Sequence, residues 1–139
     1  MKTWATDWPA KVEEEKTVNS AGVSGFIMGE LPAEMAGTAD RFLFIRALHN
    51  LARFEQDGGH LTTALESAYD ILKPGGMVGV VQHEAPESAS DEWASGANGY
   101  LRRDFVIAQL EAAGFEFLAS SDINANPKDI PGEKDKVWR

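Results

Sequence analysis

The feature that most constrains the fold is an amphipathic helix that ends at a Pro-Gly-Gly turn and leads into an apolar strand. The turn is formed by Pro74, Gly75 and Gly76. Proline cannot continue a helix, and glycine adopts the positive φ that a tight turn needs. "MVGVV", 77–81, then predicts a short strand. Over about 60–72 the apolar residues recur at helical spacing, at Leu61, Ala64, Leu65, Ala68, Ile71 and Leu72.

Two further strands and a second helix are predicted around this unit. "RFLFIRAL", 41–48, is almost continuously apolar, which indicates a strand covered on both faces. A helix is predicted over 102–113, with Gly114 where helices commonly end, and "FEFLASSDI", 115–123, predicts another strand. Strands and helices that alternate with short connections form a parallel sheet with right-handed crossovers. We therefore expect an α/β fold. The inward positions of the second helix are Val106, Ile107, Leu110 and Ala113.

The N-terminal part, 1–37, is expected to be irregular, with a short helix and a weak strand. Pro9 suits the first turn of a helix through "AKVEEEK", and "VSGFIMG", 23–29, predicts a strand bracketed by glycines. "APESASDEWASGANG", 85–99, predicts a loop or a weak helix. Asp57 is the candidate N-cap of the helix that begins near residue 60.

Length and charge exclude several classes of protein. The 139 residues fit a single domain, and the formal net charge of −9 disfavours a nucleic-acid binder or adhesion to anionic membranes. The chain has no cysteine, so disulfides and thiolate chemistry are excluded. No apolar run is long enough to span a bilayer, and the first residues lack the apolar core of a secretory signal. The compartment stays open, with the cytoplasm as the default.

Candidate site residues follow the predicted strands, because ligands of open α/β sheets bind at the carboxyl ends of the strands. His49 could be a general base or a substrate donor, or it could cap the following segment or pack at a loop. His83 has the same two interpretations, and a metal site would use both with Glu84. Neither a nucleophile elbow nor a phosphate-binding loop occurs. The residues at the strand ends are Arg46, His49, Asn50, Gln82, His83 and Glu84.

Two more segments have two interpretations each. Arg102 and Arg103 offer charge for an anionic ligand, or they are exposed arginines at a helix start. "SDINANPKD", 121–129, is either turn chemistry of Asn, Asp and Pro or a loop that faces a ligand.

Several of these motifs together resemble one family. "LKPGG" before a strand, "AD" before "RFLFIRALHN", and "EAAGF" followed by "INANPKD" and "VW" are similar to the class I S-adenosylmethionine-dependent methyltransferases, in particular to one group of predicted methyltransferases. The resemblance covers about 38–138, the second half of such a domain. It implies a small-molecule acceptor, S-adenosylmethionine as the methyl donor, and His49 as the base. It also implies acceptor-binding roles for Arg46, Asn50, His83, Asn124 and Asn126.

The sequence departs from this family where the cofactor is held. The glycine-rich turn after the family's first strand and the acidic residue after its second strand have no counterpart here, since Gly22, Gly25 and Gly29 are spaced differently. We therefore expect a partial Rossmann-like domain, with 38–139 as the C-terminal half of a methyltransferase fold. It would be a fragment or a short form that binds the cofactor weakly. An unpaired sheet edge would favour self-association. The alternative is a non-catalytic module that a partner chain completes.

Overall fold

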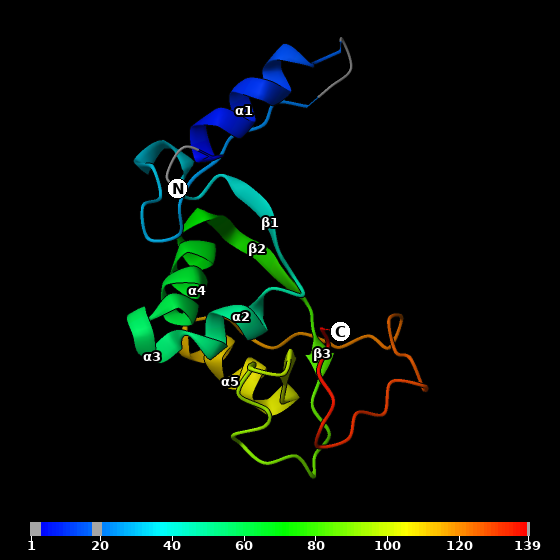
Figure 1. Ribbon diagram of the computed structural model, residues 1–139. Helices are drawn as coiled ribbons and strands as arrows, with labels where there is room; N and C mark the ends of the chain where they lie inside the picture. The colour runs from blue at the N-terminus through cyan, green and yellow to red at the C-terminus, as the bar shows by residue number, and fades with distance from the viewer. Residues whose placement is uncertain (1–3, 18–20, 139) are drawn as a thin grey trace.

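The computed structural model describes residues 4–17 and 21–138 as a mixed α/β structure (Figure 1). Parts of the predicted segment 1–37, namely 1–3 and 18–20, and residue 139 lie outside the described residues. The elements in chain order are α1 (Trp4–Glu14), the 3-10 helix η1 (Ala33–Met35), β1 (Ala39–Ile45), α2 (Leu48–Arg53), α3 (Glu55–Gly58), α4 (His60–Ile71), β2 (Leu72–Val81), β3 (His83–Glu84), β4 (Tyr100–Leu101) and α5 (Arg103–Ala112).

The main sheet has two parallel strands, β1 and β2. Phe42 pairs with Val78 and Phe44 with Val80, and the register shifts where the Pro-Gly-Gly turn lies opposite the start of β1. Gly75 has the predicted positive φ, at 78°. The parallel pairing and the helix before the turn confirm the α/β prediction. The polar stretch after β1, for which no element was predicted, forms α2 and α3.

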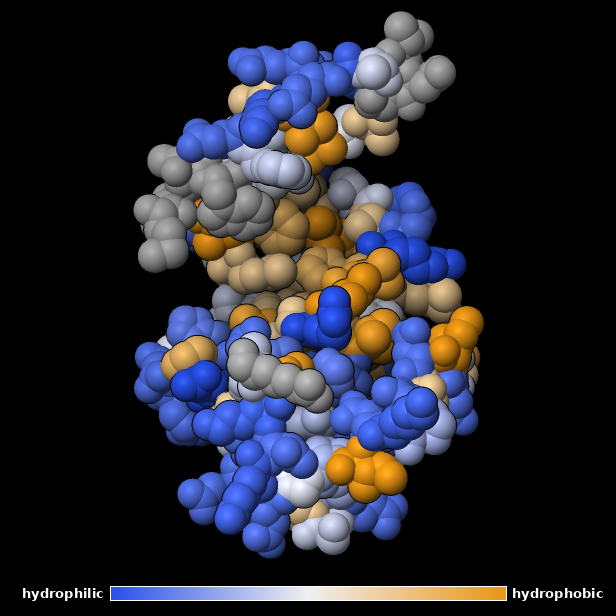
Figure 2. Space-filling model, turned by 45° about the vertical axis from the view of Figure 1, so that its right-hand side comes forward, coloured by the Kyte–Doolittle hydropathy of each residue, from blue (hydrophilic) through white to orange (hydrophobic). Residues whose placement is uncertain are grey.

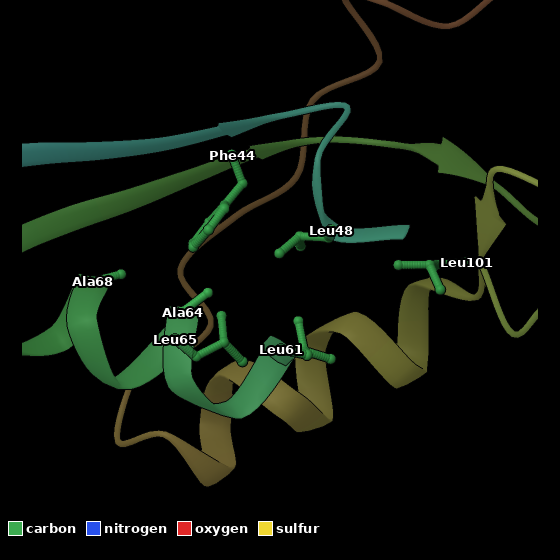
Figure 3. Close-up of a cluster of buried hydrophobic side chains, with 7 residues drawn as sticks. All are labelled: Phe44, Leu48, Leu61, Ala64, Leu65, Ala68 and Leu101. Atoms are coloured by element: carbon green, nitrogen blue, oxygen red, sulfur yellow. The ribbon is translucent and has the colours of Figure 1, made fainter. Parts of the chain in front are cut away.

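The core lies between one face of this sheet and the helices. All six predicted apolar positions of α4 are buried. Figure 3 shows Phe44 pointing from β1 toward Ala64 and Ala68, while Leu48 and Leu101 close the cluster near Leu61. Helix α5 adds half-buried side chains such as Val106 and Leu110 to this cluster. The helical periodicity of the sequence therefore located the core correctly.

The opposite face of the main sheet is bare, so the prediction of a strand covered on both faces was wrong. Leu43 is 62% exposed, Ile45 58% and Met77 41%. Figure 2 shows apolar side chains gathered at the height of β1 and β2, between α1 and the polar lower part of the molecule. Among the described residues, β1 and β2 pair only with each other, so both strands also have an open edge.

Two predicted strands are absent from the described chain. Residues 115–123 form no strand: Phe115 packs against Tyr69, but Leu118 is 80% and Ile123 87% exposed, and no neighbouring strand pairs with their backbone. A strand without such a neighbour leaves its backbone groups unpaired. The glycine-bracketed segment 23–29 also differs, because the N–H of Glu30 donates to the carbonyl of Ile27 and closes a turn.

Helix α1 begins at Trp4, so Pro9 lies in its interior and not in its first turn as predicted. Proline cannot donate a hydrogen bond to the carbonyl of Ala5, four residues earlier. Gly25 approaches this carbonyl so closely that an added Cβ would lie 2.6 Å from the oxygen. The glycine is therefore required by the contact between α1 and the following turn.

The cap of α4 also differs from the prediction, since Asp57 lies inside α3 and does not cap it. The carboxylate of Glu55 accepts hydrogen bonds from the backbone N–H of Leu61 at 2.6 Å and from the hydroxyl of Thr62 at 2.6 Å. These bonds, with that from the Thr62 hydroxyl the largest cause, lower the pKa of Glu55 below its usual value. The residue before the helix is Gly59, which has no side chain to cap it and has a left-handed φ of 65°.

No helix among the described residues is both long and apolar enough to cross a membrane.

Candidate functional site

The side chain of Gln82, directly after β2, links α2 to the segment that precedes β4. Its Nε2 donates to the carbonyl of Gly99 at 2.8 Å and to that of His83 at 3.2 Å. These two carbonyls fix the orientation of the amide, so its Oε1 is the group that faces Nδ1 of His49, at 3.1 Å. An amide oxygen only accepts, so neutral His49 carries its proton on Nδ1 and keeps a lone pair on Nε2.

His49 is buried in the first turn of α2, with 3% of its surface exposed. The ring of Trp138 lies edge-on against it, with 5.3 Å between the ring centroids. His49 therefore packs against the C-terminal Trp138, and its role as a general base stays a prediction.

A second cluster surrounds His83 at the pairing of β3 with β4. Its Nδ1 lies 3.6 Å from Oδ2 of Asp129, and the hydroxyl of Tyr100 donates to Oδ1 of the same carboxylate at 3.2 Å. Burial, followed by the charge of Asp129, raises the pKa of Tyr100. Trp93 stacks on the ring of Tyr100, with centroids 5.0 Å apart. The Nε2 atom of His83 is buried and has no hydrogen-bond partner among the described residues.

The two arginines at the start of α5 are both engaged within the chain. Arg103 forms two hydrogen bonds with the carboxylate of Glu84, at 3.0 and 3.1 Å. Arg102 donates to the carbonyls of Glu87 and Ala89, and it pairs with Asp91 at 3.1 Å. Arg102 therefore holds the 85–99 loop, and Arg103 ties the start of α5 to β3.

The remaining predicted site residues are not drawn into these clusters. Arg46 has a left-handed backbone, with φ of 52°, and its exposed side chain has no partner among the described residues. The side chains of Asn50 and Asn124 are exposed in the same way. Asn126 accepts a hydrogen bond from the backbone N–H of Lys128 at 3.1 Å. This contact is the turn chemistry that was one of the two interpretations of the asparagine segment.

Sequence reasoning missed four residues that contact His49 or His83, namely Gln82, Tyr100, Asp129 and Trp138. Gln82 was noted at a strand end but was given no role, although a glutamine directly after a buried strand could have been a signal. Nothing local marks Tyr100 or Asp129, since they meet only through the folding of the tail. Trp138 belonged to a motif of the resemblance but had no assigned contact.

The described residues do not fit a complete site for S-adenosylmethionine. The connections that leave β1 and β2 contain no glycine-rich turn that could cradle the cofactor, and neither strand ends in a free carboxylate. Among the described residues, no three imidazole or carboxylate groups come together to hold a metal ion, and Glu84 is paired with Arg103. We therefore assign no cofactor contact to this chain.

Comparison of the chain with models of protein families, with curated proteins and with solved structures found no match.

Proposed function

We propose that this chain is the acceptor-side part of a class I S-adenosylmethionine-dependent methyltransferase domain that acts on a small molecule. The observation that carries the proposal is the hydrogen bond between the His49 imidazole, which follows β1, and the amide of Gln82, which directly follows the adjacent parallel strand β2. Ligands of open α/β sheets bind at this end of the strands. The sequence motifs around both histidines are those that resemble the family.

Methyl transfer requires two things of the residues at these strand ends. When bound, the cofactor would supply an activated methyl group, and the protein would align the acceptor and take up any proton that it loses. His49 has the tautomer for this task, because its Nδ1–H donates to Gln82 and leaves the Nε2 lone pair available. Arg46, whose guanidinium has no partner among the described residues, could hold a charged acceptor.

The first experiment is calorimetric titration of the 139-residue chain with S-adenosylhomocysteine. We expect no binding in the micromolar range, because the groups that grip the cofactor are lacking. Micromolar binding would show that the chain holds the cofactor by other residues and would overturn the assignment to the acceptor side alone.

The second experiment examines the DNA upstream of the codon for Met1. The proposal predicts an in-frame segment that encodes a strand followed by a glycine-rich turn. If no such segment is encoded there or in a protein that co-purifies with the chain, the methyltransferase proposal fails.

A second candidate function is a non-catalytic module that another chain completes, and the bare face of the main sheet favours it. Parallel sheets are usually covered by helices on both faces, whereas Leu43, Ile45 and Met77 are exposed here. A second copy of the chain is the simplest cover. Size-exclusion chromatography with light scattering separates the candidates, because a monomer of 15.1 kDa at high concentration would exclude completion by a second copy.

A further inference from the structure

The C-terminal tail folds back beside β3 and β4 and borders an open hollow that none of the proposed roles uses. In Figure 1 the tail, coloured orange to red, loops away from α5 and returns past β3 to the C-terminus. The hollow has a volume of about 430 Å³, which is large enough for a small organic molecule. It is lined by Tyr100, Lys128, Asp129, Ile130, Pro131, Lys134, Asp135, Lys136 and Trp138.

The charged groups around the hollow are not balanced. The ammonium groups of Lys128, Lys134 and Lys136 have no hydrogen bond or ion pair to any described residue. Both aspartates, in contrast, are engaged within the chain. Asp129 accepts from the Tyr100 hydroxyl, and Asp135 accepts from the backbone N–H of Gly132 at 2.8 Å. The two carboxylates keep their negative charge, so the three lysines leave the hollow with one excess positive charge in a chain whose net charge is −9.

The backbone of the tail is held at several points. The backbone N–H of Val137 donates to the carbonyl of Asn98 at 3.0 Å, and the indole N–H of Trp93 donates to the carbonyl of Glu133 at 3.0 Å. The side chain of Asn126 closes the turn that precedes Lys128. The hollow is therefore bounded by contacts on both sides and not only by a free loop.

One wall of the hollow is aromatic. Trp138 is 44% exposed, although the edge-on contact with His49 restricts its ring. Tyr100 is 5% exposed and is fixed by the stacked ring of Trp93. A partly exposed indole offers a flat apolar surface, while the lysines that also line the hollow attract negative charge.

We propose that this hollow binds a small aromatic carboxylate, with the carboxylate facing the lysines and the ring against Trp138. The carboxylate would meet cations that lack an internal partner, and the planar ring would cover exposed indole surface. The proposal concerns binding, and it holds whether or not the chain takes part in methyl transfer.

The test uses benzoate as the probe, with benzamide as a neutral molecule of nearly the same shape. Binding is followed by tryptophan fluorescence and by backbone amide NMR of the whole chain. We expect saturable binding of benzoate that weakens as salt is added, and benzamide affinity at least about tenfold lower because it lacks the charge. Inorganic phosphate tests the aromatic wall, and we expect it to bind more weakly than benzoate.

Variants locate the site. Lys134→Ala combined with Lys136→Ala should weaken benzoate binding by roughly tenfold, since each removes one charge from the hollow. Lys16→Ala is the matched control. Lys16 follows the end of α1, pairs with Glu13 and does not line the hollow. Circular dichroism should show all variants folded, as these side chains are exposed.

Three results would overturn the proposal. Benzoate could bind no better than benzamide, or phosphate could bind as tightly as benzoate. The lysine variants could also bind benzoate as the control does.

Discussion

Replacement of Gln82 by alanine tests whether one amide links α2 to the segment that precedes β4. In the folded chain this side chain forms hydrogen bonds with Nδ1 of His49 at 3.1 Å, with the carbonyl of Gly99 at 2.8 Å and with that of His83 at 3.2 Å. Alanine removes these three bonds and also the bond that Oε1 accepts from the backbone N–H of His49 at 3.4 Å. His49 and Gly99 are buried, so solvent replaces these bonds poorly.

The expected loss follows from these contacts. A hydrogen bond contributes about 1 kcal/mol net to stability, and a buried polar group left without a partner costs about 1–3 kcal/mol. The two bonds to buried groups therefore predict a decrease of about 2–4 kcal/mol in the free energy of unfolding. The bond to the carbonyl of half-buried His83 adds less, because water can replace it.

Urea unfolding at pH 7, followed by tryptophan fluorescence and circular dichroism, measures this loss. Gln56→Ala is the control, because this glutamine is exposed on α3 and has no side-chain partner among the described residues. It should change stability by less than about 0.5 kcal/mol. A Gln82→Ala loss no larger than the control's would refute the reasoning. Nitrogen NMR of His49 should also show the proton on Nδ1 in the parent chain and a change in the variant.

Three further predictions concern stability and can be measured by the same unfolding assay. Leu65→Ala should cost about 2–5 kcal/mol, because the side chain is buried in the core. Leu43→Ala should cost less than about 1 kcal/mol, because Leu43 is 62% exposed. Equal losses would contradict the uncovered face of the sheet. Gly96→Ala should destabilise by more than about 2 kcal/mol, since its φ is 96° and its Cβ would meet the backbone of α2, while Gly22→Ala, with open space around it, should be tolerated. Glu55→Gln should destabilise the chain at pH 7. The folded pKa of Glu55 lies below its usual value of 4.5, so its carboxylate stabilises the fold only while it is ionised. The difference in unfolding free energy between the parent chain and the variant should therefore shrink as the pH falls through that folded pKa. A difference that does not vary with pH would count against the cap.

Much of the fold was predictable because its signals are local. The apolar spacing of α4, the Pro-Gly-Gly turn and the apolar run of β1 depend on residues a few positions apart, so each indicates its own structure. The same local reasoning failed at 115–123, because an apolar segment becomes a strand only when a neighbour pairs with its backbone. It also failed at Asp57, because the carboxylate that accepts from the helix start belongs to Glu55, six residues before Leu61.

The candidate site was less predictable. The sequence placed His49 and His83 at strand ends, and the parallel pairing of β1 and β2 brings these ends together. It could not show that Gln82 bonds to His49, that Trp138 covers His49, or that Tyr100 meets Asp129. These contacts depend on where a tail without regular structure crosses the ends of the strands.

The sequence by itself determined the strand–helix–strand unit, the buried face of α4 and the acidic, cysteine-free character of the chain. Periodicity and turn chemistry act over a few residues and are therefore readable without a structure. Only the tertiary structure decided which face of the sheet is covered, which partner each polar side chain at the strand ends takes, and where the lysines of the tail gather. These outcomes depend on contacts between segments far apart in the sequence, which no local pattern specifies.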